Sequence, residues 1–146
     1  MTVDSIKLNS TVVVLILSTT SDDYFDFKES VRSTWLKSLE QKGVKCLFYQ
    51  GGEDRNYLEG DTIKLECDDG LHYSAEKLRM AIQFIMKMIP DISLLYRTNL
   101  SSYIDKTVFL KYLDALDDLT NCYIGVKGEK SILSEYFYRN KYIKYP

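Results

Sequence analysis

The fold is decided by the stretch Thr11-Val12-Val13-Val14-Leu15-Ile16-Leu17, which is aliphatic at every position after the first. A continuous run of β-branched and leucine residues is typical of a strand that is covered on both faces, as strands are in parallel sheets. The run is far shorter than the roughly 20 apolar residues that a membrane-spanning helix needs. We therefore expect a central parallel strand here, and no membrane span.

The residues that follow alternate between helical and extended patterns. After a short polar stretch, apolar side chains recur every fourth residue from Phe27 to Leu39, which predicts a helix that ends near Gly43 and buries Trp35 in the core. Asp26 or the acidic pair before it is expected to cap this helix. Further patterns predict strands at 44–49, 62–66, 92–96 and 122–126, and helices at 73–88 and 106–116.

The predicted order of elements is β-α-β-β-α-β-α-β. Helices that separate strands imply right-handed crossovers and a mostly parallel sheet, so we expect an α/β fold, a Rossmann-like three-layer sandwich. The polar stretches are short and no repeat is found, which predicts a single domain over residues 1–146. The segment 135–146 is rich in tyrosine and lysine and lacks periodicity, and we expect it to be an irregular tail.

Charge and cysteine content exclude some functions. The chain has 19 basic and 21 acidic residues and a formal net charge of -2, so it has no excess positive field for non-specific binding of nucleic acid. Cys46, Cys67 and Cys122 form an odd set without a Cys-x-x-Cys spacing. We expect buried free thiols in a reducing compartment, and hence a cytoplasmic location.

Common catalytic motifs are missing from the sequence. His72 is the only histidine, which excludes clusters of histidine ligands and leaves any Ser-His-Asp or Cys-His arrangement dependent on one ring. We expect His72 to be a solvated loop residue. The chain has neither Gly-x-x-x-x-Gly-Lys-Ser/Thr nor Gly-x-Gly-x-x-Gly, so it lacks the phosphate-binding loops of P-loop and dinucleotide-binding proteins.

Polar residues gather where the predicted strands end. In open parallel sheets, ligands bind beyond the carboxyl ends of the strands. Hydroxyls, glycines, carboxylates and an arginine follow the first four predicted strands, at Ser18, Thr19 and Thr20, at Gly51 and Gly52, at Asp68, Asp69 and Gly70, and at 97–102. This composition suits a polar ligand such as a nucleotide.

The same residue types also form ordinary turns and helix caps, which is a second interpretation of these segments. Asn99 or Ser102 would then cap the helix that follows, and residues 68–70 would be a plain turn. Arg97 is harder to explain in this way, because a guanidinium at the end of a buried strand needs an anionic partner. The sequence leaves open whether that partner is a carboxylate or a phosphate.

One short motif resembles a known family. Val31-Arg32-Ser33-Thr34-Trp35 is similar to the Arg-x-Thr-Trp signature of the β-1,3-galactosyltransferase and Fringe-like glycosyltransferases. Three later segments resemble that family in order: 44–51 its next strand, 69–77 the opening of its second long helix, and 94–104 its Asp-Asp-Asp strand end. In this last segment, Arg97-Thr98-Asn99-Leu100-Ser101-Ser102 resembles a variant found in viral and bacterial members, which would place the protein in the host cytoplasm if it is viral.

The resemblance implies a GT-A fold that binds a nucleoside-diphosphate sugar, usually a UDP-sugar, for hexosyl transfer to a carbohydrate acceptor or glycoprotein. Ser18 and Thr19 would contact the base and ribose, and Asp69 would accept hydrogen bonds from them. Arg32 and Lys77 would face the diphosphate or order the loops around it. The family pattern assigns no catalytic residue in this chain.

The aspartate motif of the family is replaced here. Asn99, Leu100 and Ser101 stand where three aspartates would be, and Asn99 and Ser101 would lie by the diphosphate and any Mn²⁺ or Mg²⁺ ion. Neutral amide and hydroxyl oxygens hold such ions less strongly than carboxylates do. Arg97 would instead supply positive charge to the diphosphate.

The resemblance also implies that this chain is the N-terminal, donor-binding half of the family's domain, because a stretch similar to 142–146 precedes the acceptor half in the family. Exposed tyrosines in the tail would favour a docking surface for that half or for a second copy in a homo-oligomer. The rival hypothesis is a non-catalytic α/β interaction module with a vestigial nucleotide site. The replaced aspartates and the missing half favour this rival.

Overall fold

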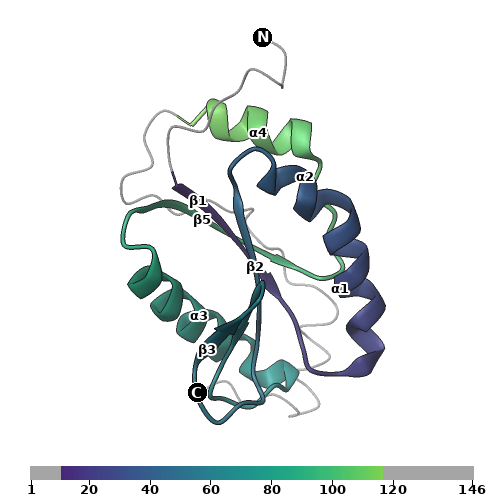
Figure 1. The fold of residues 1–146 in the computed structure, drawn as a ribbon, viewed down its shortest axis with the longest axis vertical. Helices are drawn as coiled ribbons and strands as arrows, with labels where there is room; N and C mark the ends of the chain where they lie inside the picture. The colour runs from purple at the N-terminus through teal and green to yellow at the C-terminus, as the bar shows by residue number, and fades with distance from the viewer. Residues whose placement is uncertain (1–10, 117–146) are drawn as a thin grey trace, which may run out of the picture.

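A five-stranded sheet forms the centre of the protein, for which the computed structural model describes residues 11–116 (Figure 1). Its strands are β1 (Thr11–Leu17), β2 (Lys45–Gln50), β3 (Tyr57–Glu59), β4 (Thr62–Lys64) and β5 (Ile92–Asn99). They lie in the order β3-β4-β2-β1-β5. β1 pairs in parallel with β2 and β5, β2 pairs in parallel with β4, and only β3 is antiparallel to its neighbour. The sheet is therefore mixed and mostly parallel, as expected for an α/β fold.

Helices cover both faces of this sheet. After β1 come α1 (Phe25–Val31), the π-helical turn η3 (Arg32–Leu36) and α2 (Lys37–Glu40), while α3 (Ser74–Met88) precedes β5 and α4 (Lys106–Asp114) follows it. Short 3-10 turns, η2 (Asp22–Tyr24) and η4 (Leu71–Tyr73), come before α1 and α3. Figure 1 shows α3 on one side of the sheet and α1 and α2 on the other, so the described part of the chain has three layers.

The core lies on both sides of β1. Val12, Val14 and Ile16 pack in one cluster with the α1–α2 segment and α4, and Val13 and Leu15 pack in a second cluster with α3. All five side chains are at most 1% exposed. Because neighbouring residues of a strand point to opposite faces, only a strand covered on both faces is apolar at every position. The prediction of a central parallel strand is confirmed.

The first predicted helix is confirmed in part. Trp35 is buried in the core, and the segment ends where Gly43 N–H donates a hydrogen bond to Glu40 O, as expected. The helix is not regular, however, because the π-helical turn η3 interrupts it. Asp26 does not cap it: α1 begins after Tyr24 without a side-chain cap, since the turn η2 supplies the residues before it.

Other local predictions need correction. Residues 57–59, which the sequence pattern placed in a polar loop, form the strand β3, because a two-residue turn that contains Gly60, at φ +60°, folds them back onto β4. Neither Asn99 nor Ser102 caps α4, since Asp105 Oδ1 accepts the Val108 N–H at 2.9 Å. β5 continues through Asn99, which puts Arg97 inside the strand.

Some predictions fall outside the described residues. The strand at 122–126, the tail at 135–146 and Cys122 all do so, and they stay predictions. Cys46 and Cys67 are free thiols, of which Cys46 is buried and Cys67 half-buried. His72 is exposed, as expected. Among the helices of residues 11–116, none is long and apolar enough to cross a bilayer.

Candidate functional site

The carboxyl ends of β1 and β5 form a switch point in the sheet. From β1 the chain passes over one face, through α1 and α2, to β2, and later it returns over the other face, through α3, to β5. The strand order therefore reverses at β1, with β2 on one side of it and β5 on the other, and ligands of open α/β sheets bind at such a point. A cavity of about 570 Å³ lies there. This volume is typical of small-molecule sites.

Most of the predicted site residues line this cavity. It takes residues from the ends of β1 and β5, from the loop after β4 and from α3. The predicted residues that it brings together are Ser18, Thr19, Asp69, Lys77, Arg97, Asn99 and Ser101. The expectation that these loops meet at one edge of the sheet therefore agrees with the geometry.

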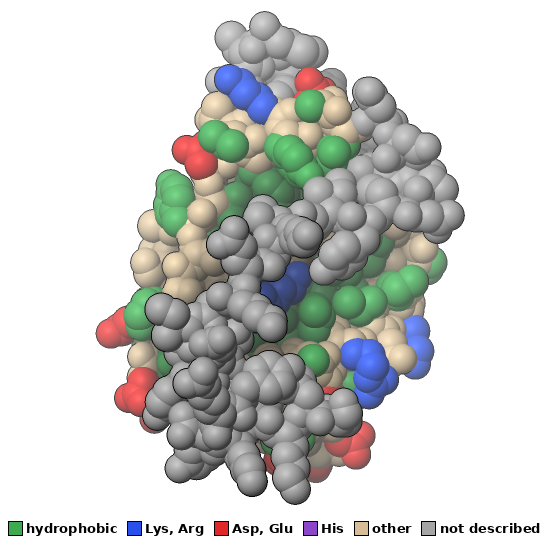
Figure 2. Space-filling model, turned by 180° about the vertical axis from the view of Figure 1, so that it is seen from behind, with side chains coloured by type: hydrophobic (Ala, Val, Ile, Leu, Met, Phe, Trp, Pro, Cys, Tyr) green, Lys and Arg blue, Asp and Glu red, His purple; other side chains and the backbone are tan. Residues whose placement is uncertain are grey.

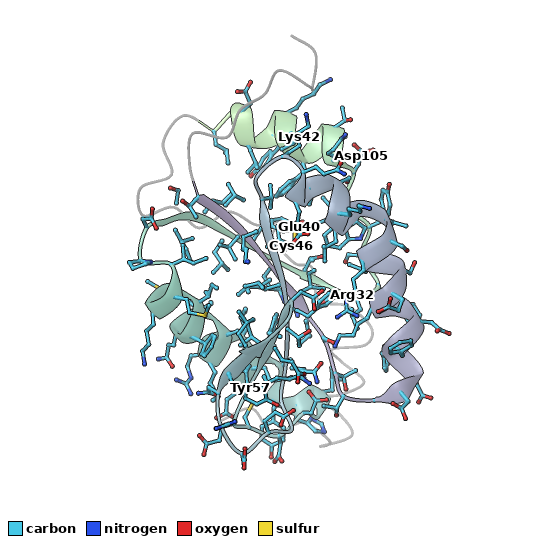
Figure 3. All side chains as sticks on the ribbon, viewed as in Figure 1. Arg32, Glu40, Lys42, Cys46, Tyr57 and Asp105 are labelled. Carbon is cyan, nitrogen blue, oxygen red and sulfur yellow. The ribbon has the colours of Figure 1, made fainter. Side chains whose placement is uncertain are left out.

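Arg32 is the predicted residue that the structure does not bring to the cavity. Its Nε and Nη2 atoms donate to the two carboxylate oxygens of Asp61, each at 2.8 Å, and its Nη1 donates to Glu29. The guanidinium also lies 5.0 Å from the centre of the Phe48 ring. Figure 3 shows Arg32 between the α1–α2 segment and the sheet. The hydrogen bonds that Arg32 donates to Asp61 raise the pKa of Arg32. Arg32 thus ties the first helical segment to the β3–β4 turn.

Asp69 is the centre of a hydrogen-bond network that joins three loops. Its Oδ2 accepts from Thr19 Oγ1 and Thr20 N, both at 2.6 Å, and from Thr20 Oγ1 at 3.0 Å. Its Oδ1 accepts from Gly51 N at 2.8 Å and from Lys77 Nζ at 3.1 Å. Burial opposes ionisation of this carboxyl, but the hydrogen bonds outweigh burial and lower its pKa to about 2. Asp69 is therefore a carboxylate that holds the ends of β1 and β2 beside the loop after β4.

This network corrects the role expected of Asp69. A carboxylate offers about four lone-pair sites, and five protein donors already occupy them. No acceptor is left for a ribose hydroxyl. Sequence reasoning found the residue but not its role, because its partners Thr19 and Gly51 are 50 and 18 residues away along the chain.

Lys77 orders the same loops, which was one of the two roles expected of it. Its side chain is 3% exposed, and Nζ lies 3.4 Å from Ser18 O, 3.0 Å from Asp69 O and 3.1 Å from Asp69 Oδ1. An ammonium group has three donors, so these contacts use all of them. Gly51 allows the loop after β4 to lie close to the end of β2, since a Cβ at position 51 would lie 2.6 Å from Asp68 O.

Two groups in the cavity remain without a full set of partners. Ser18 is 2% exposed, and its Oγ has no hydrogen-bond partner within the described residues. Arg97 Nε donates to Tyr49 Oη at 3.4 Å, and in residues 11–116 its guanidinium has no carboxylate partner. Burial raises the pKa of Tyr49, while the neighbouring Arg97 acts in the opposite direction, so the phenol is a neutral partner. Arg97 is exposed on a strand that is only partly buried, so the expectation of a guanidinium on a buried strand that needs an anion is wrong. The guanidinium lines the cavity, and the described side chains offer it no carboxylate.

Apolar side chains form the other wall of the cavity. Tyr24 and Phe27 are 47% and 48% exposed, their ring centres are 5.9 Å apart, and Leu71 lies beside the same cavity. Figure 2, which views the molecule from behind, shows a basic side chain near the middle of this face with hydrophobic side chains to its right. The sequence interpretation placed Phe27 on the buried stripe of a helix, and this is wrong. The aromatic residues just after the polar stretch at 18–23 were the signal that could have identified this wall.

The oxygen atoms at the end of β5 do not fit a divalent cation. Asn99 and Ser101 offer neutral oxygens, and Leu100 between them is buried in the core. Mg²⁺ and Mn²⁺ bind mainly through carboxylate oxygens. Within residues 11–116, no three His, Cys, Asp or Glu side chains lie where they could hold an ion.

The chain was compared with protein-family models, with curated proteins and with solved structures, and none of the three comparisons found a match.

Proposed function

We propose that this chain binds a nucleoside-diphosphate sugar, most simply a UDP-sugar, in the cavity between β1 and β5. We further propose that it is a GT-A-type glycosyltransferase domain for hexosyl transfer, or the donor-binding domain of one. The observation that carries the proposal is the Arg97 guanidinium, which lines the cavity without a carboxylate partner among the described side chains. An arginine that faces a cavity without a protein carboxylate is able to bind phosphate oxygens there.

The rest of the cavity fits the other parts of such a ligand. The exposed rings of Tyr24 and Phe27 offer apolar surface on which a base can stack. Inorganic phosphate has no apolar part that could pack against these rings. The buried Ser18 hydroxyl, which has no partner in the described part of the chain, can bond to the ribose or base. Asn99 and Ser101 are placed to bond the diphosphate oxygens beside Arg97.

Titration calorimetry with UDP, GDP and CMP, each with and without Mn²⁺, tests the proposal. Replacing Arg97 with Ala should weaken UDP binding by about 10- to 100-fold, because a hydrogen bond to a charged group contributes roughly 1.5–3 kcal/mol. The matched control is Arg79→Ala, which removes an exposed arginine of α3 that is bonded to Gln83. We expect the control to bind UDP as the wild type does.

Two outcomes would contradict the proposal. If a folded wild-type chain gives no heat with any of the nucleotides, the rival hypothesis of a non-catalytic interaction module is favoured. If Arg97→Ala lowers the melting temperature strongly but leaves UDP binding unchanged, Arg97 has a structural role. A hydrolysis assay with several UDP-sugars adds a test of turnover, since slow release of UDP requires the donor site without an acceptor.

A further inference from the structure

A second, smaller hollow adjoins the cavity, and we call it the side pocket. Its volume is about 190 Å³, and it shares Phe27, Leu100 and Ser101 with the larger cavity. At roughly 30 Å³ for each water molecule, it has room for about six waters, which is room for one sugar ring but not for a nucleoside. The two hollows together therefore suit a ligand with a large part and a small part.

An irregular helical turn shapes the side pocket. In η3 the backbone of Thr34 leaves helical geometry, at φ -109° and ψ -105°, and Thr34 Oγ1 donates to Ser30 O at 2.6 Å. The following residue, Trp35, donates from Nε1 to Ser102 O at 3.1 Å, which fixes the loop after β5 against this turn. Turns of this kind occur often at functional sites. The walls of the side pocket are thus held in place by contacts between η3 and the loop after β5.

The chemistry of the side pocket differs from that of the larger cavity. Of the described residues that line it, none is charged. Ser30 and Ser101 contribute hydroxyls that bond to no other described group, and Phe27 and Tyr103 contribute exposed rings. Uncharged hydroxyls beside aromatic rings suit a ligand whose surface alternates between hydroxyl and C–H groups, whereas a phosphate would be left without a cation.

We propose that the side pocket binds the hexose ring of the donor while the larger cavity binds its nucleotide. This inference rests on the proposed function and adds to it the place of the transferred sugar. Ser101 and Phe27, which line both hollows, lie where the diphosphate meets the sugar. The Arg-x-Thr-Trp segment then has a specific task, because η3 consists of Arg32 to Leu36 and forms one wall of the sugar site.

The test compares UDP with UDP-glucose, UDP-galactose and UDP-N-acetylglucosamine by calorimetry. In the wild-type chain we expect at least one UDP-hexose to bind about tenfold more tightly than UDP, because two hydroxyl hydrogen bonds and one ring contact add roughly 1.4 kcal/mol. Ser30→Leu fills the side pocket and should remove this tenfold difference while leaving the affinity for UDP unchanged. Ser33→Leu, the same change three positions later on a residue that lines neither hollow, is the matched control and should keep the difference.

The possible results separate the two proposals. Thermal unfolding checks that each variant is folded, and Tyr103→Ala, at a side chain that is 72% exposed, replaces Ser30→Leu if the latter does not fold. Equal binding of UDP and every UDP-hexose by the wild type overturns the inference but leaves nucleotide binding standing. A difference that survives in Ser30→Leu also overturns it. If UDP itself fails to bind, the proposed function fails and the inference falls with it.

Discussion

Asp69 provides the sharpest test of how this site is built. The change is Asp69→Asn, which keeps the shape of the side chain and removes its charge. An amide accepts hydrogen bonds only at its oxygen, whereas a carboxylate accepts them at both oxygens. The NH₂ group of the asparagine therefore faces other donors, either Lys77 Nζ and Gly51 N or the groups of Thr19 and Thr20, and those donors lose their acceptor. Lys77 then remains buried, at 3% exposure, without a counter-charge. Breaking a buried ion pair in this way costs about 3–5 kcal/mol, and we expect that loss in the free energy of unfolding at pH 7.

The pH dependence of this loss follows from the pKa of Asp69. Folding lowers that pKa from 3.8 to about 2, so the carboxylate stabilises the protein above pH 4 and loses this contribution as the pH falls toward 2. The difference of nearly two pKa units corresponds to about 2 kcal/mol, of which roughly half is already lost at pH 3. The stability gap between wild type and Asp69→Asn should therefore narrow by about 1 kcal/mol between pH 7 and pH 3.

Urea unfolding of both proteins at pH 7 and pH 3 measures these quantities. The control is Asp68→Asn, which changes the exposed neighbouring carboxyl and should alter the free energy of unfolding by no more than about 0.5 kcal/mol. A loss below about 1 kcal/mol at pH 7, or a gap that does not change with pH, would refute the view that Asp69 is the charged centre of the loop network.

Three further predictions test other contacts. Gly51→Ala should destabilise the fold by about 1–3 kcal/mol and weaken UDP binding, because its Cβ would lie 2.6 Å from Asp68 O and push the Asp69 loop away; unfolding curves and calorimetry check both effects. Arg32→Ala should cost roughly 1 kcal/mol of stability, since its ion pair with Asp61 is part-exposed, and should leave UDP affinity unchanged; weaker binding would show that Arg32 reaches the ligand. Burial raises the pKa of Cys46 to about 12, so Cys46→Ala should not change the amount of thiol that reacts rapidly with a disulfide reagent at pH 8 in the folded protein.

The large elements could be predicted from the sequence because their signals are local. The aliphatic run of β1 indicates a strand covered on both faces, and the apolar spacing that places Trp35 in the core reflects helix periodicity. The rule that ligands bind at the carboxyl ends of parallel strands then identified the edge at which Ser18, Arg97 and Asn99 meet. Each of these inferences needs only the period of an element and the direction of its strand.

The irregular parts could not be predicted in this way. The break at Thr34 falls between Val31 and Trp35, which are four residues apart as they would be in an unbroken helix, so their spacing does not reveal it. Phe27 fits the same stripe but is 48% exposed and lines the cavity. Spacing predicts which face a side chain is on and does not show how far the partner layer extends.

The sequence by itself determined that the chain forms an α/β sheet around β1, with polar loops at one edge and a basic residue among them. Only the tertiary structure decided which charges pair, because Arg32 meets Asp61 across 29 residues of chain and Lys77 meets the side chain of Asp69 and the backbone of Ser18. Charge pairing depends on distances that arise only when loops from separate strands meet. The same packing that neutralises Arg32 and Lys77 with protein partners leaves Arg97 beside the cavity without a described carboxylate, and so selects it as the candidate for binding phosphate.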